Sequence, residues 1–345
     1  MDILQIYDII NSNPKELYDD KVVIGFDTSH MLINICSEED FKIGTMAMYW
    51  IYKVGDKLPI PDKILHSPNV QALSTNYTCA MYWIEFLFSY PPMYIIHDPL
   101  IKNIYGQTCA MLFIYHNRYL PSKELLHDPT IYDNNGDTCA MYWIRYCASL
   151  PHNVLLHDPS IQNSKGETCA MLWISLLKTL PPKELRHDPF IQNSKGETCA
   201  MLWISLLKTL PPKELRHDSS IQNKDGETCA MLWIRFHKSI PPKVIRHDVN
   251  IKNKHGYTCA MYWIRLYKCM PPNALLHDSR IQTNKGKTCS MLWISLLNTL
   301  PPINLLHEPS IQDIHGNTCA SYWKKYCKTP LPIEIQNDKP LLSKT

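Results

Sequence analysis

The pair Thr-Cys, followed by Ala or once by Ser, returns every thirty residues along most of this chain, and this period constrains the fold more than any other feature. The cysteines of the marker stand at positions 79, 109, 139, 169, 199, 229, 259, 289 and 319. Residues 161–188 are identical to residues 191–218. A fixed period of this size is typical of a solenoid, in which each unit buries its apolar face against its neighbours. Solenoids present long surfaces, so we predict a non-catalytic binding protein.

The array is predicted to hold about ten units over residues 41–330. Its first unit, which contains Gly44, Thr45 and Trp50, is three residues longer and less alike, and its Gly44 is assigned to the turn glycine of the later units. Residues 1–40 follow the pattern poorly, although residues 13–17 echo residues 182–185. A solenoid needs a closed end, so residues 1–40 are predicted to be a capping segment and residues 331–345 a tail.

Composition narrows the classes of partner. The chain is 45% hydrophobic and 19% charged, as expected for a folded protein. Its formal charge of +3 is spread among mixed Lys, Arg, Asp and Glu, which disfavours nucleic acid and anionic membranes as partners. No secretory signal and no apolar run of transmembrane length is visible. We therefore expect a monomeric protein of the cytoplasm or the nucleus, with protein partners and no cofactor.

One unit is predicted to fold as a turn and two helices. Gly166 supplies the positive φ of a tight turn, and Thr168 can cap a first helix over residues 169–180. Ala170, Trp173 and Ile174 have the spacing of one buried helix face. Prolines 181 and 182 end this helix and begin a shorter one over residues 182–187. Trp returns at the position of Trp173 in nine of ten units, so these rings are predicted to be buried.

This pattern resembles the ankyrin repeat, whose unit is a turn plus two antiparallel helices over about 33 residues. The family's motif of Asp or Asn, two residues, Gly, one residue and Thr-Pro-Leu-His matches residues 163–171, with Cys169 at the Pro and Met171 at the His. The resemblance covers residues 41–330 and implies an all-α solenoid of stacked helix-turn-helix repeats. Three residues are missing from the region of the second helix, and the family's hydrogen-bonding His is absent.

Thirteen cysteines invite disulfide or metal hypotheses. Nine of them stand one per repeat, and stacked helices lie about 8–10 Å apart. A disulfide needs Cα atoms within about 7 Å, and zinc needs four ligands around one ion. These nine are therefore predicted to be small buried residues at the start of the first helix, whereas Cys147, Cys269 and Cys327 are predicted to be more exposed.

A His followed by an acid also recurs once per repeat. Such a pair could act as a general base or a metal ligand. Because the pairs repeat in register with the structural residues, we favour a structural role: His near the last carbonyls of the second helix, and Asp starting the next turn. A repeated metal-binding ladder remains the alternative. The pairs are His97-Asp98, His127-Asp128, His157-Asp158, His187-Asp188, His217-Asp218, His247-Asp248, His277-Asp278 and His307-Glu308.

Comparison of the repeats with one another points to the function. The framework hardly changes, but the turn tips and the outer half of the first helix do. Ankyrin-like proteins bind partners with these same places, so the resemblance implies a protein-binding scaffold or adaptor, with a nucleic-acid-binding helical repeat and a metal-binding protein as alternatives. No catalytic or metal-binding residue is predicted. The predicted partner-binding residues are Tyr105, His116, Arg145, Tyr146, Arg235, His237, Arg265 and Tyr267.

Overall fold

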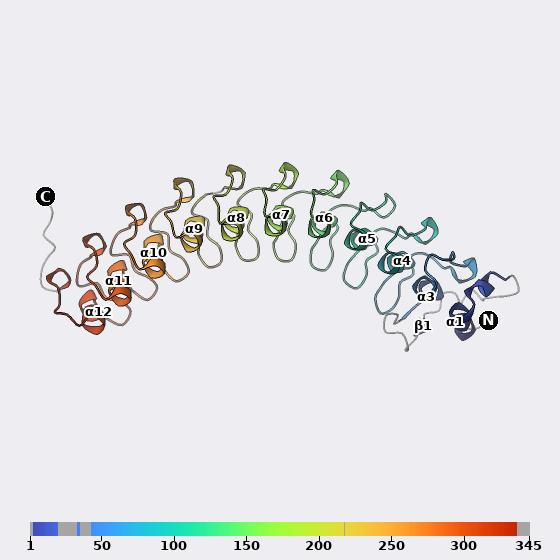
Figure 1. The fold of residues 1–345 in the computed structure, drawn as a ribbon, viewed down its shortest axis with the longest axis horizontal. Coiled ribbons are helices and arrows are strands. Elements are labelled where there is room, and N and C mark those ends of the chain that lie inside the picture. The colour runs from blue at the N-terminus through green and yellow to red at the C-terminus, as the bar shows by residue number, and fades with distance from the viewer. Residues whose placement is uncertain (1–2, 20–32, 35–42, 217, 337–345) are drawn as a thin grey trace. The chain divides into compact units, whose positions relative to one another are not determined.

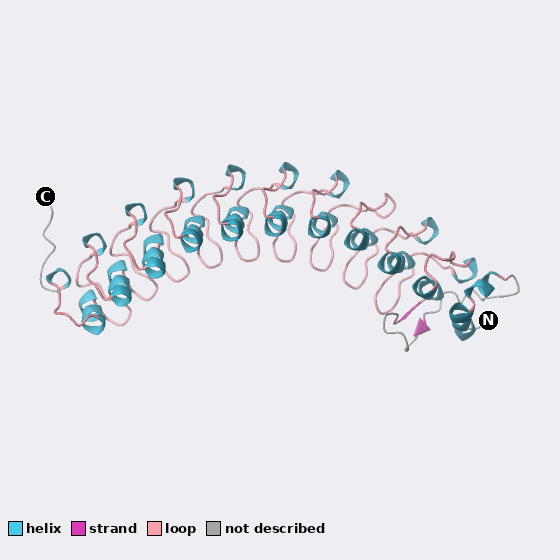
Figure 2. Ribbon diagram, viewed as in Figure 1, coloured by secondary structure: helices cyan, strands magenta, loops and turns pink. Residues whose placement is uncertain are grey.

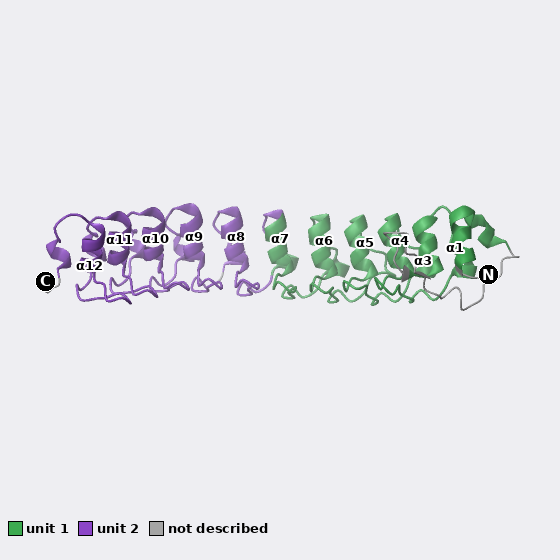
Figure 3. Ribbon diagram, turned by 90° about the horizontal axis from the view of Figure 1, so that it is seen from below, with its two compact units in different colours: residues 1–176, 182–186 green, residues 177–181, 187–345 purple. Residues whose placement is uncertain are grey.

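The computed structural model describes residues 3–19, 33–34, 43–216 and 218–336. These residues form two compact units, residues 1–176 with 182–186 and residues 177–181 with 187–345 (Figure 3). Each unit is a row of short helices that lie side by side and are joined by long loops (Figure 1). The helices are α1 (Ile3–Ser12), α3 (Met46–Lys53), α4 (Cys79–Leu87), α5 (Cys109–Asn117), α6 (Cys139–Cys147), α7 (Cys169–Leu177), α8 (Cys199–Leu207), α9 (Cys229–His237), α10 (Cys259–Tyr267), α11 (Cys289–Leu297) and α12 (Cys319–Tyr326).

A single 3-10 turn follows most of these helices, on the side of the row opposite the long loops (Figure 2). These turns are η1 (Pro14–Tyr18), η2 (Asp62–Ile64), η3 (Met93–Ile95), η4 (Asn153–Leu155), η5 (Lys183–Leu185), η6 (Lys213–Leu215), η7 (Lys243–Ile245), η8 (Asn273–Leu275), η9 (Ile303–Leu305) and η10 (Ile333–Ile335). The all-α stack of thirty-residue repeats is thus confirmed, apart from one antiparallel pair of two-residue strands, β1 (Ile33–Asn34) and β2 (Ile43–Gly44).

The first helix begins where the sequence predicts and ends earlier. In α8 the Thr198 hydroxyl accepts a hydrogen bond from the Met201 amide, which satisfies one free amide of the first turn. The predicted end near the twelfth helical residue is wrong. Lys208 takes a left-handed conformation (φ 53°) and stops the helix after nine residues. Equivalent residues do the same in the other repeats from Phe88 to Asn298, so a positive φ and not the double proline ends the helix.

The predicted second helix is reduced to one 3-10 turn. Pro212 precedes η6 in an extended conformation, and only Lys213–Leu215 are helical. Leu215 is nonetheless buried, so the turn keeps the core contact that a second helix would make.

The core of each unit is made between neighbouring repeats. Ala140, Met141 and Ile144 of α6 pack against Cys169 and Leu172 of α7. The same columns recur in the second unit, where Met261 and its equivalents are completely buried. The prediction of buried Trp rings holds for Trp50, Trp83, Trp143, Trp263 and Trp323, whereas Trp173, Trp203, Trp233 and Trp293 are partly exposed.

The turn glycines hold successive loops together. Gly136 has φ +76°, and a Cβ on it would lie 2.8 Å from the Ser164 amide of the next repeat. That close approach lets Ser164 donate to the Asn135 carbonyl at 2.8 Å. The assignment of Gly44 to the same column is wrong. Gly44 lies in β2 and directly precedes Thr45, whereas each turn glycine stands two residues before the Thr of its repeat. In the second repeat Asn76 (φ 55°) takes the turn position instead.

The N-terminal segment repeats the pattern of a helix and a 3-10 turn. Leu17 of η1 is completely buried, as its sequence echo Leu185 is almost completely buried. Tyr7 of α1 stacks on Tyr49 of α3 with ring centroids 4.9 Å apart, and Tyr49 Oη donates to Asn11 Oδ1 at 2.9 Å. The first helix therefore covers the face of α3 that a preceding repeat would occupy. The capping role of residues 1–40 stays a prediction.

Candidate functional site

Hollows lie between the long turns and the first helices, on the side of the repeats that carries the predicted partner-binding positions. Each is walled by a helix and by the turns on both sides of it, and its charge is set by a few side chains. Two of them differ sharply. One lies around α6 in the first unit, and the other lies between α10 and α12 in the second.

The hollow around α6, here the balanced hollow, is lined by Asp133, Asp137, Tyr142, Arg145, Tyr146 and Lys165 among others. Arg145 Nε lies 3.3 Å from Asp137 Oδ2, and its Nη2 lies 3.7 Å from Glu167 of the next turn. Tyr142 Oη donates to Asp133 Oδ2 at 2.9 Å. The Arg145 guanidinium and the carboxylates of Asp133 and Asp137 therefore each face an opposite charge or a hydrogen-bond donor.

The arginine of α9 follows the same rule. Arg235 Nη1 lies 3.1 Å from Glu227 Oε2, and Tyr262 of α10 donates to Glu227 Oε1 at 2.7 Å. Glu227 stands directly after the turn glycine and Arg235 eight residues later, as Asp137 and Arg145 do. An acid at this turn position thus neutralises the base on its own helix.

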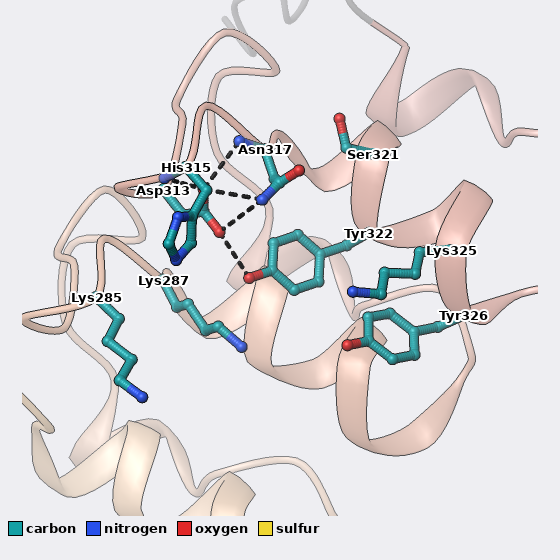
Figure 4. Close-up of a pocket in the computed structure, with 9 residues that line it drawn as sticks. All are labelled: Lys285, Lys287, Asp313, His315, Asn317, Ser321, Tyr322, Lys325 and Tyr326. Carbon is teal, nitrogen blue, oxygen red and sulfur yellow. Dashed lines mark hydrogen bonds between the residues drawn. The ribbon is translucent and has the colours of Figure 1, made fainter.

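The groove from α10 to α12, here the basic groove, is different. Two adjoining hollows share Lys285 and Lys287, and Arg265 and Lys325 lie at its two ends. Asp313 is the single acid that lines it, and its carboxylate is fully used by Tyr322 Oη and by the backbone amides of His315 and Asn317 (Figure 4). Burial alone would raise the pKa of Asp313, but these hydrogen bonds lower it to about 2.

Three of the four bases of the basic groove face aromatic rings. The Arg265 guanidinium lies 5.2 Å from the Tyr257 ring centroid, Lys287 Nζ lies 5.0 Å from that of Tyr322, and Lys325 Nζ lies 5.5 Å from that of Tyr326. Among the described residues none of the four bases forms an ion pair within 4.0 Å. The groove therefore carries a net positive charge, because four bases face the single carboxylate of Asp313, and tyrosine rings form part of its wall.

The predicted partner-binding residues divide into two groups. Arg145 and Tyr146 line the balanced hollow, Arg235 and Arg265 line hollows of the second unit, and Tyr105 is an exposed turn tip. The others are engaged in contacts between or within repeats: His116 Nε2 lies 2.8 Å from Glu85 Oε2, His237 stacks on Trp233, and Tyr267 donates to the Ile234 carbonyl.

The predicted partner-binding residues do not include Lys285, Lys287, Tyr322 and Lys325, although Lys285 stands at one of the variable turn tips. The signal for Lys287 is present in the column that directly follows the turn glycine. This column reads Gln107, Asp137, Glu167, Glu197, Glu227, Tyr257, Lys287 and Asn317. Its acids end at Glu227, which marks where the hollows change from balanced to basic.

The repeated His forms hydrogen bonds that connect one repeat to the next. His127 Nδ1 lies 2.8 Å from the Asp128 carbonyl, an oxygen that can only accept, so Nδ1 carries the proton and Nε2 accepts. Nε2 lies 2.8 Å from the Thr108 hydroxyl and 3.6 Å from Cys139 Sγ of the next repeat. The Thr108 hydroxyl also accepts from the Met111 amide. The His thus links the helix start of its own repeat to the helix start of the next.

This geometry corrects the predicted contact of His with the last helix carbonyls, while the predicted turn role of the acid is confirmed: Asp128 Oδ1 accepts from the Thr130 amide at 2.9 Å. His66, which precedes Ser67 instead of an acid, makes the same bonds to Thr45 and Cys79 and was overlooked. His217 lies outside the described residues.

Burial keeps both partners of this link neutral. Desolvation lowers the pKa of His127, although its bond to the Asp128 carbonyl acts in the opposite direction. Desolvation raises the pKa of Cys139 to about 12. The contact is therefore a thiol S–H against a neutral imidazole, which differs from the thiolate of a catalytic Cys–His pair.

Within the described ranges no three His, Cys, Asp or Glu side chains are grouped as a metal site would need, and no helix is long and apolar enough to span a membrane.

No protein-family model matches this chain, and no curated protein sequence matches it. Similar solved structures include the ankyrin repeat domain of Bcl-3, a member of the IkappaB protein family (16% identity, TM-score 0.34, covering 48% of this chain and 82% of that chain). Another is EF0377, an ankyrin repeat protein (14% identity, TM-score 0.22, covering 49% of this chain and 79% of that chain). Both neighbours are ankyrin repeat proteins, the family that the sequence resembles.

Proposed function

We propose that this chain is a non-catalytic protein-binding scaffold that uses the hollows between its turns and first helices. The observation that supports this proposal most is that the framework residues stay the same from repeat to repeat, whereas the residues that line the hollows change. The Thr, Cys, Met and His columns and the turn glycines hardly vary, and their hydrogen bonds are made within the protein. The side chains that line the hollows vary in charge and size at fixed places. A scaffold of this kind gains specificity by changing the hollow without changing the fold.

The test is a capture experiment with two altered baits. One bait carries Ala at Arg145, Arg235 and Arg265, which line the hollows. The control bait carries Ala at Lys183, Lys213 and Lys243, which are exposed on the opposite side and remove the same charge. The proposal expects a protein that the intact chain and the control bait retain and the hollow bait loses. Equal retention by all three baits would refute the use of this face.

A further inference from the structure

The basic groove indicates the charge of its ligand more clearly than the other hollows do. Within the described chain its four bases form no ion pair within 4.0 Å. Lys285, Lys287 and Lys325 share one hollow with a single carboxylate, that of Asp313, whose acceptors are already used, and Arg265 lines the adjoining hollow. Like charges held together repel one another and favour binding of an anion that neutralises them. The ligand is therefore expected to carry several negative charges.

The framework holds these cations in place before any ligand arrives. The Lys285 carbonyl accepts from the Ile314 amide, so the turn that carries Lys285 is tied to the next turn. Lys287 directly follows Gly286, whose Cβ, if it had one, would lie 2.6 Å from that same amide. Lys325 lies on the capped helix α12. A ligand consequently meets an arranged set of charges and does not have to order a flexible loop, which lowers the cost of binding.

The spacing of the groove selects a ligand conformation. Successive repeats place equivalent residues about 8–10 Å apart. A polyproline II segment advances about 3.1 Å per residue with three residues per turn, so every third side chain lies on one face about 9 Å apart. Acidic side chains at every third position would meet one hollow each. The partly exposed rings of Tyr257 and Tyr326 suit such a segment, because aromatic grooves dock the pyrrolidine faces of polyproline II chains.

The neighbouring hollow favours a short peptide over a nucleic acid. Asp225 and Glu227 line the hollow on the α9 side of Arg265. A phosphate backbone that continued along the repeats would meet these carboxylates within one repeat, whereas a peptide of about six residues ends before them.

We propose that the basic groove binds an extended, proline-containing acidic segment of a protein partner, with a carboxylate at every third residue. This inference rests on the proposed scaffold function and specifies its ligand. The charges at Lys285, Lys287 and Lys325 bind the carboxylates, and the tyrosines contact the segment between them.

The experiment measures fluorescence anisotropy of a labelled (Glu-Pro-Pro)2 peptide against the full chain. Comparison peptides are a six-residue chain of the same composition with the two Glu contiguous, and (Lys-Pro-Pro)2. The groove variant is Lys287→Glu with Lys325→Glu. The control variant, Lys213→Glu with Lys243→Glu, makes the same charge change at exposed positions of η6 and η7. Circular dichroism melts establish that both variants keep the fold.

We expect saturable binding of (Glu-Pro-Pro)2, a Kd at least tenfold higher for the groove variant, and a change of less than twofold for the control variant. The contiguous-Glu peptide should bind several-fold more weakly, and (Lys-Pro-Pro)2 should not bind. Equal binding by both acidic peptides would overturn the spacing argument, and equal weakening by both variants would overturn the site. Tighter binding of a labelled oligothymidine would assign the groove to nucleic acid instead.

The outcome is separable from that of the scaffold proposal. If no acidic peptide binds but the capture experiment still finds a protein lost only from the hollow bait, the ligand class is wrong and the scaffold function stands. If the peptide binds at the groove and no protein is captured, the groove is supported and the scaffold proposal lacks its partner.

Discussion

The balanced hollow and the basic groove are built on the same backbone and differ in charge. In both, a glycine with positive φ allows the next turn to approach, and a Thr caps the helix that forms one wall. Around α6 the residue after the glycine is Asp137, which pairs with Arg145. At α10 the equivalent residue is Tyr257, and Arg265 has only a ring beneath it. The residue that directly follows the turn glycine therefore decides whether the Arg of the helix is neutralised within the protein or stays available to an external anion.

The largest effect is expected where the shared framework is broken. Gly226→Ala should lower the free energy of unfolding by about 3 kcal/mol, because φ is +73° and the new Cβ would lie 2.5 Å from the Lys254 amide. Gly316→Ala has the same backbone strain (φ +76°) but no heavy atom nearer than 3.9 Å, so about 1–2 kcal/mol is expected. Urea unfolding measures both. Equal losses would mean that the close approach between turns does not matter.

Acidification should lower the stability of the folded protein in both regions, because both contain the repeated His. Desolvation lowers the pKa of His97, His127, His187, His247, His277 and His307 below the ordinary 6.5. Between the lowered pKa and 6.5 the unfolded chain binds protons that the folded chain does not. Stability is thus present above about pH 6.5 and is lost as pH falls through the folded-state values. The urea midpoint should drop between pH 7.5 and 5.5, with net proton uptake on unfolding.

Asp313 does not complicate this window, because its pKa of about 2 places its titration well below pH 5.5. A midpoint that stays constant or rises on acidification would contradict the neutral state of the His links and would indicate that these imidazoles are charged in the folded protein.

Exchanging the residues that directly follow the turn glycine tests the difference between the two regions directly. Glu227→Tyr removes the partner of Arg235 and the acceptor of Tyr262, so a loss of about 1–2 kcal/mol is expected. Tyr257→Glu places an acid opposite the exposed Arg265, and its effect on stability should stay within about 0.5 kcal/mol. The same Tyr257→Glu change should weaken anion binding at the basic groove, while Glu227→Tyr should extend it. Chemical denaturation and peptide titration of the two variants provide the readouts.

The sequence predicts the framework well because the framework is periodic. Thr198 before an apolar run, the turn glycines and the buried Cys column each repeat often enough to reveal their role. The end of the first helix was missed because Lys208 has a poor intrinsic preference for positive φ, and only the packed bend imposes it. The basic groove was missed for the opposite reason: Lys287 and Lys325 are ordinary surface residues until the fold places them across one hollow.

The smallest effect concerns the thiols near the two regions. Cys147 ends α6 and is partly buried, Cys269 follows α10 and is exposed, and Cys327 follows α12. The nine column cysteines are buried, and burial raises the pKa of Cys139 and Cys259 to about 12, so their thiolate fraction at pH 8 is negligible. Among the cysteines of the described residues, a thiol reagent at pH 8 should therefore modify Cys269 first and Cys147 and Cys327 more slowly. Peptide mapping after brief labelling identifies the sites. Early modification of Cys139 or Cys259 would show that neighbouring repeats separate in the native state, and the two regions could then no longer be treated as two copies of the same local framework with different side chains.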